Sequence, residues 1–405
     1  MTISIRPDLD DLHTLPKGHR DSVRRLGEFA RERVAPTAGE RDRAPIGTVD
    51  WDLVGEARDL GGLRMGLPEE MGGLGLGAEG LGRVLEEFAA ADPGFALILG
   101  ATGLFQTPIV LAGDERLIAE YLMPFLGDAP LLGCNAVAEE LNGTDLVLAQ
   151  NAPYATDMTT ATLRGDHYVL SGKKKYITNA PVARYATVMA NVAGHPGSTG
   201  LTCFIVDLEW DGVRRGVTHD KFGYRTAPAG ELIFNDVSVP VENVIGDVLG
   251  GWDLNTTQGN ICRVTCAAIA TGLARHSLER ALEWVTERRQ GGGTLFRHQM
   301  TARKIADMAA AVESARALWV NAARTVDTTL PVPTYEPAIA KMVADRAAVD
   351  NANIAMSLIG AQAFQRDDDM ERILRDSFGP RIYEGSPEAL AMTITDVLCV
   401  GDERR

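Results

Sequence analysis

The first third of the chain carries apolar residues at helical spacing. Four of them fall on one face of a helix: Val23, Leu26, Ala30 and Val34. Pro36 is expected to end this run, because proline cannot continue an α-helix. The pattern stays helical to about residue 130, with one glycine-rich interruption at residues 71–77. It predicts an α-helical first domain over residues 1–130.

The spacing of apolar residues changes between residues 131 and 245. Four short apolar runs are separated by turn residues; they are residues 168–170, 186–189, 202–206 and 232–234. Gly165-Asp166 is typical of a tight hairpin turn. The basic run Lys173-Lys174-Lys175 is expected at the solvated edge of a hairpin. These features predict a small β-domain or barrel between two helical regions.

Helical spacing returns from residue 246 to residue 405. Its clearest part is one stripe with offsets of three and four residues: Ile305, Met308, Val312, Ala315 and Trp319. Such a stripe suits a helical core or a contact between subunits, and the pattern leaves both open. Residues 325–336 are expected to connect two helices, since they are polar and contain prolines. The chain is therefore predicted to be an α+β protein with domain boundaries near residues 130 and 245.

Composition narrows the class of protein. At 405 residues, with 45% apolar and 23% charged residues, the chain has the size of two or three globular domains. A formal net charge of −15 argues against nucleic acid or an anionic membrane as a partner, because both attract an excess of Lys and Arg. Residues 1–17 lack an apolar run, so neither a signal peptide nor a membrane anchor is expected.

The five cysteines are scattered and odd in number, which favours reduced thiols in a cytoplasm over a disulfide framework. Cys262 and Cys266 lie one helical turn apart. No histidine offers the spacing of a further metal ligand, so core packing of the two thiols is favoured and no metal site is expected.

The stretch of residues 381–390 places one carboxylate, Glu384, in a short apolar context beside Gly385. Apolar neighbours would desolvate the carboxylate and raise its pKa, as a base for a carbon-bound proton requires. Glycine would let another molecule approach the backbone closely. A solvated glutamate at a helix end is the alternative interpretation.

Several motifs give this stretch a context. Tyr176-Ile177-Thr178-Asn179 occurs together with residues 68–75, 231–240 and 287–290 in one characteristic order. In this order and rough spacing the chain resembles the acyl-CoA dehydrogenases over about residues 20–400. The resemblance implies a helical, β and helical domain arrangement, a bound FAD and an acyl thioester substrate. The glycine-rich loop follows no expected strand, so a nicotinamide fingerprint is not indicated.

The resemblance also implies roles for the residues around the carboxylate. Glu384 matches the base that takes the α-proton of the thioester while the β-hydrogen leaves as hydride to the flavin. Its backbone N–H matches a donor to the thioester carbonyl, which would stabilise the enolate-like charge. Tyr383, Gly385 and Arg263 match positions near the substrate. Cys262 stands where some branches of the family carry their base instead, so Glu384 has no rival.

Further positions match residues that hold FAD in the family. Near the flavin ring and phosphates these are Thr178, Tyr176 and Thr144; at other points of the cofactor site they are Gly360, Ser386 and Glu388. Arg288 and Gln290 match residues that reach the FAD pyrophosphate of a neighbouring subunit, and arginine suits a diphosphate through paired charge-assisted hydrogen bonds. A homo-oligomer, a dimer or tetramer, is therefore expected.

The chain departs from the family pattern at three places. Ala138 replaces a threonine that contacts the flavin, residues 291–293 are three glycines where a phenylalanine is expected, and the glutamine-glycine motif near Gly360 is reduced. FAD is still expected to bind, because a few lost contacts of about 1 kcal/mol each weaken a large interface without abolishing it.

Two further functions remain open beside an FAD-dependent acyl-CoA dehydrogenase. One keeps the fold and the base but takes an acyl chain on a carrier protein, or passes electrons to oxygen and not to an electron-transfer flavoprotein. The other is a non-catalytic partner subunit in a mixed oligomer, which the reduced flavin motifs suggest and the retention of Glu384, Gly385 and Thr178 opposes.

Overall fold

A computed structural model describes residues 11–400 of the chain. The first region contains α1 (Lys17–Phe29), α2 (Ala38–Arg43), α3 (Trp51–Asp59), α4 (Ala78–Ala91), α5 (Pro93–Ala112) and α6 (Glu115–Leu117). The middle region contains β1 (Gly133–Ala136), β2 (Thr160–Arg164), β3 (His167–Thr178), β4 (Tyr185–Val192), β5 (Leu201–Asp207), β6 (Val213–Thr218), β7 (Ala229–Pro240) and β8 (Val244–Ile245). The last region contains α7 (Gly251–Glu287), β9 (Arg289–Gln290), β10 (Gly293–Thr294), α8 (Gln299–Thr328), α9 (Tyr335–Ile359), α10 (Asp369–Ser377) and α11 (Pro387–Val400).

The predicted apolar face of the first helical segment is confirmed. Its four residues are fully buried and pack in one core cluster with α4 and α5: Val23, Leu26, Ala30 and Val34. The prediction that Pro36 ends the run is wrong in part. The chain continues through a π-turn at Ala30–Val34 and a 3-10 turn at Ala35–Thr37 into α2. Pro36 stands at the start of that 3-10 turn, where a missing N–H costs no helical hydrogen bond.

The middle region is one eight-stranded sheet. Its strand order is β6-β7-β3-β2-β4-β5-β8, and β1 pairs with β4 in parallel. All four predicted runs lie in strands, namely β3, β4, β5 and β7. Gly165-Asp166 forms the predicted two-residue turn, with Arg164 paired to His167 and Gly165 at a φ of 64°. Glycine reaches that left-handed backbone conformation without steric cost.

The expected solvation of the basic run is wrong for Lys174. This side chain is fully buried and donates to the Glu139 carboxylate at 2.6 Å. Lys174 lies on the same face of β3 as the buried Tyr168 and Leu170, because side chains of a strand alternate between its two faces. One shift of register between β3 and β7 precedes Lys174 and another follows it.

The last region is a helical bundle built around α7. Four residues of the predicted stripe are fully buried in the bundle core: Met308, Val312, Ala315 and Trp319. Within this chain the stripe is therefore core. The expected connection at residues 325–336 is shorter than predicted, because α8 continues to Thr328 and α9 begins at Tyr335.

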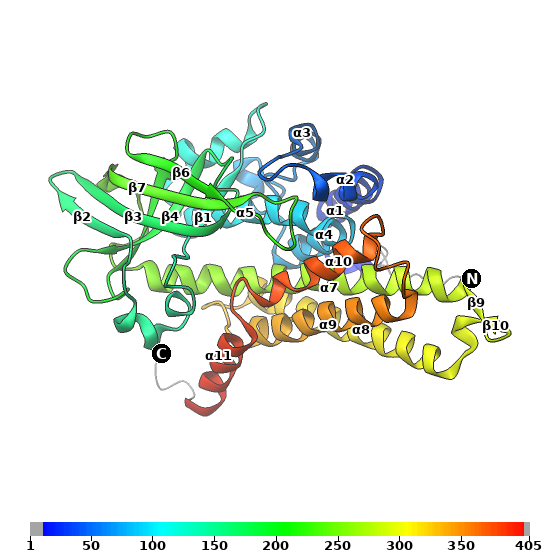
Figure 1. Ribbon diagram of the computed structural model, residues 1–405. Coiled ribbons are helices and arrows are strands. Elements are labelled where there is room, and N and C mark those ends of the chain that lie inside the picture. The colour runs from blue at the N-terminus through cyan, green and yellow to red at the C-terminus, as the bar shows by residue number, and fades with distance from the viewer. Residues whose placement is uncertain (1–10, 401–405) are drawn as a thin grey trace.

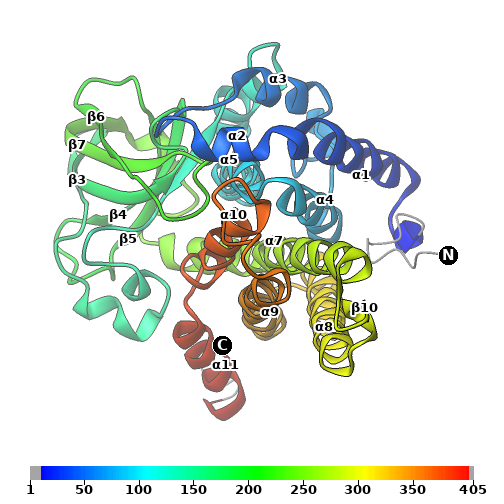
Figure 2. The same cartoon turned by 45° about the vertical axis from the view of Figure 1, so that its right-hand side comes forward.

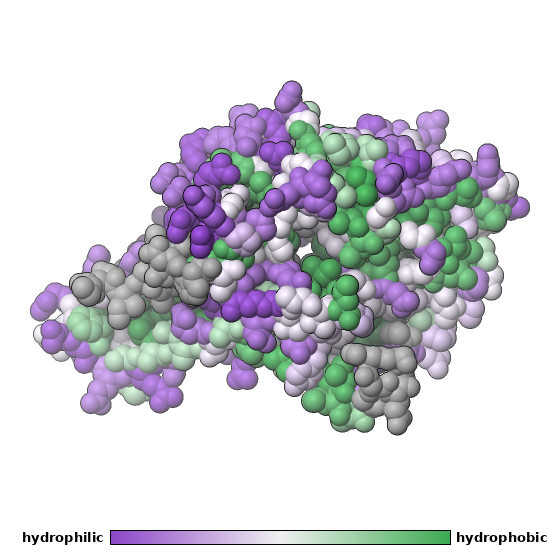
Figure 3. All heavy atoms as spheres, turned by 180° about the vertical axis from the view of Figure 1, so that it is seen from behind, coloured by the Kyte–Doolittle hydropathy of each residue, from purple (hydrophilic) through white to green (hydrophobic). Residues whose placement is uncertain are grey.

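Figure 1 shows α7 running beneath both other regions, with the sheet at one end of the molecule and the β9–β10 hairpin at the other. In the turned view, α10 lies above α7 and α9, and α11 projects from the bundle (Figure 2). From behind, hydrophobic residues gather around the hollowed centre of the molecule (Figure 3). The predicted α+β class, with helical, β and helical regions in this order, is confirmed. The boundaries at residues 130 and 245 stay predictions.

Helix α5 is long and apolar enough to cross a membrane by its length and composition. Just over half of its most apolar window is buried inside the structure, where it contacts β1 and α7. A core helix of a globular protein passes the same test, so this feature alone is weak evidence for a membrane span.

Candidate active site

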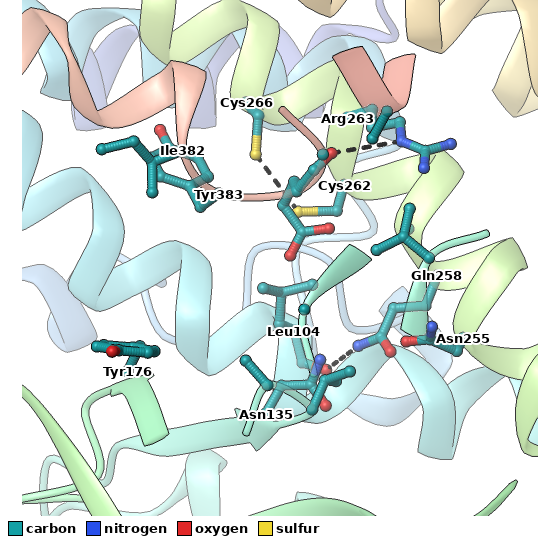
Figure 4. Close-up of a pocket in the computed structure, with 18 of the residues that line it drawn as sticks. Leu104, Asn135, Tyr176, Asn255, Gln258, Cys262, Arg263, Cys266, Ile382 and Tyr383 are labelled. Atoms are coloured by element: carbon teal, nitrogen blue, oxygen red, sulfur yellow. Dashed lines mark hydrogen bonds between the residues drawn. The ribbon is translucent and has the colours of Figure 1, made fainter. Parts of the chain in front are cut away.

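The sheet, α5 and the start of α7 enclose a cavity of about 760 Å³. Its size lies within the range of small-molecule sites, roughly 300 to 1,000 Å³. Figure 4 shows Tyr176 and Asn135 on the sheet side of this cavity, and Cys262, Cys266 and Arg263 on the side of α7. The cavity thus lies where three regions of the chain meet.

Glu384 lines the cavity from the short loop between the 3-10 turn Gly379–Arg381 and α11. Its φ of 55° is left-handed, and the following Gly385 also has a positive φ, of 101°. These two residues turn the chain sharply before Pro387 begins α11. The side chain of Glu384 is half-buried, and residues 11–400 supply no ion pair or hydrogen-bond partner to its carboxylate.

Burial raises the pKa of Glu384 above the usual value, and the positive charges of Arg263 and Lys341 offset part of this rise. Desolvation disfavours the charged form of a carboxylate, while nearby cations favour it. The backbone N–H of Glu384 also has no acceptor within the described part of the chain. The loop therefore offers an unpaired carboxylate and an unpaired N–H donor at one cavity wall.

Arg263 is buried in α7 beside this loop. Its Nε lies 3.5 Å from the carbonyl oxygen of Glu384 (Figure 4). Its Nη1 donates to Asn260 Oδ1 at 2.7 Å. Burial lowers the pKa of Arg263, and the charge of Glu384 raises it. Arg263 consequently contacts the backbone of the loop and leaves the carboxylate unpaired.

Tyr383 lies behind the carboxylate, next to a second tyrosine. Its ring meets that of Tyr224 edge to face, with centroids 6.0 Å apart, and the two hydroxyl oxygens lie 3.3 Å from each other. Burial raises the pKa of both hydroxyls well above the usual value. Both tyrosines are therefore neutral hydrogen-bonding groups at ordinary pH.

Lys341 of α9 also contacts this loop and is paired with Asp345 of the same helix; the sequence reasoning missed both residues. Lys341 is fully buried and donates to Asp345 Oδ2 at 2.7 Å, and also to the carbonyl oxygens of Pro380 and Gly385. The available signal was a lysine and an aspartate four residues apart in an alanine-rich helix, which resembles an ordinary surface pair.

The opposite wall comes from the sheet. Thr178 and Tyr176 line the cavity at the end of β3, and Thr144 lines it from a 3-10 turn. Tyr176 is 59% exposed and has a φ of 65° at the irregularity of β3, which aims its ring differently from a regular strand. Residues 11–400 provide no hydrogen-bond partner for the Thr178 hydroxyl.

The loop that carries Thr144 is fixed by a buried network. Glu139 accepts from Lys174 at 2.6 Å and from the backbone N–H of Thr159 at 2.8 Å. Asn142 donates to the other oxygen of Glu139 at 3.1 Å. Sequence reasoning noted the replacement of a threonine by Ala138 but did not foresee this network, which gives the loop a rigid base.

Cys262 and Cys266 line the cavity from α7, with their sulfur atoms 3.5 Å apart. Their hydrogen bond, burial and the charge of Glu384 together raise the pKa of the Cys262 thiol well above the usual value. Thiols with raised pKa are poor nucleophiles. Residues 11–400 contain no cluster of three or more residues that could hold a metal ion.

Eight of the residues predicted for the site line the cavity: Glu384, Tyr383, Gly385, Arg263, Thr178, Tyr176, Thr144 and Ser386. The other four do not. Arg288 and Gln290 lie exposed at the far end of α7, roughly 39 Å along the helix axis from Cys262. Gly360 ends α9, and Glu388 lies exposed in α11. The roles of all twelve residues stay predictions.

Asn255 and Gln258 of α7 also line the cavity and were not predicted. Gln258 donates to the carbonyl of Leu104 in α5 at 2.5 Å (Figure 4). Asn255 donates to the carbonyl of Leu146 at 2.8 Å. Polar residues of a helix give no such signal in sequence, since solvent accounts for them equally well. Here they join α7 to the other two regions.

Comparison with known proteins bears on this site. Models of the N-terminal, middle and C-terminal domains of acyl-CoA dehydrogenases match residues 17–128, 134–237 and 250–399. The mitochondrial short-chain specific acyl-CoA dehydrogenase of Mus musculus is 32% identical over 383 residues, which cover 94% of this chain and 90% of the relative. The short-chain specific acyl-CoA dehydrogenase of Clostridium acetobutylicum is 32% identical over 369 residues, 91% of this chain and 94% of the relative. The structure of butyryl-CoA dehydrogenase from Megasphaera elsdenii matches with a TM-score of 0.88 at 31% identity, covering 95% of this chain and 98% of that one.

Proposed function

The chain belongs to the acyl-CoA dehydrogenase family and is an oxidoreductase, and from this premise we propose that it oxidises a neutral acyl-CoA to the 2,3-enoyl thioester with Glu384 as the base. The observation that carries the proposal is the unpaired carboxylate of Glu384 in the cavity wall. A carboxylate that is desolvated and free of ion pairs is a stronger base than one in water. A solvated glutamate would not have this raised pKa.

The cofactor that membership of this family indicates is FAD. The cavity fits its ring end, since Thr178 and Tyr176 of the sheet face the wall that carries Glu384 across a space of about 760 Å³. Thr178 would donate its free hydroxyl to the ring, Tyr176 would lie against its edge, and Thr144 and Ser386 would contact the rest of the cofactor. A bound flavin supplies an acceptor for the β-hydride, which protein side chains lack.

The loop of Glu384 supplies the other groups that the proton abstraction needs. Glu384 takes the α-proton onto its carboxylate, and its backbone N–H, without an internal acceptor, would donate to the thioester carbonyl as negative charge develops there. Arg263 contacts the carbonyl oxygen of Glu384, which belongs to the next peptide along the chain. Tyr383 lines the cavity and closes the site behind the base.

We propose a neutral acyl group because of the charges around the cavity. Its apolar part is formed by Leu85, Leu97, Leu104 and Ile269. Arg263 is the one cation among the described lining residues, and it is already hydrogen-bonded to Asn260. An acyl chain with a terminal carboxylate would lack a partner there. Because relatives at 31–32% identity are named for short-chain acyl groups or butyryl-CoA, short unbranched chains are the first substrates to test.

Arg288 and Gln290 lie too far from the cavity to contact the same cofactor as Glu384 within one chain. We therefore propose that they contact the FAD of a second copy, which makes the working enzyme a homo-oligomer. Exposed apolar residues such as Met392 and Leu398 of α11 are consistent with such contacts.

Anaerobic titration of the purified yellow holoenzyme with acyl-CoA thioesters tests the proposal. A neutral short-chain acyl-CoA should bleach the flavin absorbance within seconds, while glutaryl-CoA and the matching acyl-carrier protein should bleach it far more slowly. Reoxidation by air, or only by an electron-transferring flavoprotein, then separates the two predicted acceptors. A preparation that stays colourless with added FAD, or a flavin that no thioester bleaches, would contradict the proposal.

A further inference from the structure

The base loop, residues 379–386, has little regular structure of its own. Its backbone takes the left-handed conformation at Glu384, and its regular part is the 3-10 turn Gly379–Arg381. The side chain of Ile382 is 77% exposed, so it adds little packing to the loop. Something outside the loop must fix its shape, because an unsupported loop of this length populates many conformations.

Lys341 of α9 contacts both ends of the base loop. Its ammonium donates to the carbonyl oxygen of Pro380 at 2.6 Å and to that of Gly385 at 3.2 Å. These two carbonyls precede and follow the Tyr383-Glu384 segment. The ammonium also lies 5.7 Å from the centre of the Tyr383 ring. One charged group therefore links three points around the catalytic carboxylate.

Asp345, one turn further along α9, makes a buried lysine tolerable. Its Oδ2 accepts from Lys341 at 2.7 Å, and both side chains are almost completely buried. Burial raises the pKa of Asp345 to about 6, against the effect of the Lys341 charge. Oδ1 of Asp345 is buried without a hydrogen-bond partner among residues 11–400. A pair that is buried at such cost usually has a specific task.

We propose that Lys341, balanced by Asp345, is a positioning residue for the proton abstraction; this inference rests on the proposed function. We call Lys341 and Asp345 the loop clamp. The clamp holds the carbonyls on either side of Glu384 and so fixes its carboxylate toward the cavity. Lys341 also acts through its charge, which stabilises the ionised base that burial disfavours. Arg263 of α7 contacts the carbonyl oxygen of Glu384 itself.

Several charged and titratable groups lie around Glu384 and the cavity. They are Cys262, Arg263 and Cys266 of α7, Lys341 and Asp345 of α9, Tyr383 of the base loop, and Glu139, Glu140 and Asp145 of the sheet side. Two of them, Arg263 and Lys341, lower the pKa of Glu384 through their charges. Removing the cation of Lys341 from this set raises the pKa of the base. Since the base works ionised, activity should then begin at higher pH than in the wild type.

The test compares Lys341→Met with the neutral double variant Lys341→Met/Asp345→Asn, both as holoenzymes. Both should retain flavin and the KM for the thioester, but reduce the flavin ~10- to 100-fold more slowly, because displacing a reacting group by about 1 Å costs that much. The acidic limb of the pH profile should move up in both variants. Arg346→Met is the matched control, since this exposed arginine of α9 pairs with Asp350 alone among residues 11–400 and should change none of these readouts.

Recovery of the wild-type rate in the double variant would overturn the inference, because it would show that the single variant suffers only from an unpaired buried aspartate. An unmoved pH profile in both variants would overturn the role of the charge.

Amide hydrogen exchange of residues 379–390 separates this inference from the proposed function. Both Lys341 variants should exchange faster in this peptide alone, with the rest of the bundle unchanged. If wild-type flavin is not reduced by any thioester, the proposed function fails, and the exchange experiment still decides whether the clamp holds the loop. Unchanged exchange in the base loop would overturn the clamp.

Discussion

The two ends of α7 differ in almost every physical respect. At the cavity end, Cys262, Arg263 and Gln258 are buried; Arg263 contacts the loop of Glu384, and Gln258 is hydrogen-bonded to α5. At the far end, Arg288 and Gln290 are exposed and lead into a hairpin with three consecutive glycines, two of them at positive φ. The hairpin is joined to the bundle mainly through backbone hydrogen bonds and through His298, which contacts the carbonyl of Gln290 at 2.9 Å.

This difference suggests that one chain completes the chemical part of the site but not the cofactor site. The groups around Glu384 are arranged by contacts within the chain, so their geometry does not require a partner. Residues whose task is to reach another copy gain nothing from internal contacts, and their exposure is then expected. The predictions below test whether the two ends really divide the work in this way.

The largest effect is expected at the cavity end. Glu384→Gln should keep FAD and thioester binding but lower the rate of flavin reduction by about 10³-fold or more, since a positioned general base contributes about 10² to 10⁴-fold. Stopped-flow absorbance with a short-chain acyl-CoA measures this rate. Glu242→Gln, which changes an exposed carboxylate of the sheet region, is the control. Normal bleaching in the Glu384 variant would remove this residue as the base.

At the far end, Arg288→Gln should weaken FAD binding about 10- to 100-fold, because a charge-assisted hydrogen bond contributes roughly 1.5 to 3 kcal/mol. The reduction rate of the variant saturated with FAD should be unchanged. Mixed oligomers of Arg288→Gln with Glu384→Gln sharpen the test, measured by flavin release on dilution. Sites that keep the wild-type Glu384 should bind FAD tightly again only if Arg288 reaches them from the partner chain.

The pH dependence of flavin reduction should follow the raised pKa of Glu384. Burial favours the protonated form in the folded protein, and the base must be ionised to act. Activity should therefore fall as pH drops through a value above the ordinary pKa of glutamate. Rates of flavin reduction at saturating substrate, measured between pH 5 and 9, locate this fall in activity, because raised glutamate pKa values lie roughly in that range. A fall in activity near the ordinary pKa of glutamate, or no fall at all, would mean that the carboxylate is solvated in the working enzyme.

The smallest effect is expected from the glycines of the hairpin. Gly293→Ala should stabilise the protein by about 0.4 to 1 kcal/mol, because its backbone suits alanine and its Cβ would meet only Arg297 at 3.9 Å. Gly292→Ala should destabilise it, because Gly292 has a φ of 85°. Urea unfolding measures the free energy of unfolding of both variants. Equal effects would show that the hairpin does not keep this conformation in solution.

The sequence predicted the order of regions and the strands well, since each depends on local patterns. The interest in Glu384, which lines the cavity, came from the order of motifs along the chain and not from its own segment. Prediction failed where a contact joins distant segments. Lys174 shares a face of β3 with buried residues, but nothing in its own segment reveals its partner Glu139. The sequence pattern places Lys341 on a helix surface, whereas in the structure it is covered by residues 380–385, whose carbonyls it contacts. In both cases burial of a charge depends on a partner that periodicity cannot reveal.

At Glu384 the left-handed backbone lowers the stability of the fold, while the side chain is the one proposed to act. A residue with a side chain pays roughly 1 to 2 kcal/mol for this conformation, a cost that glycine avoids. If Glu384 is the base, as proposed, replacement by glycine would remove this cost and abolish activity in one step. A screen of variants for heat resistance alone would then favour inactive proteins at this residue.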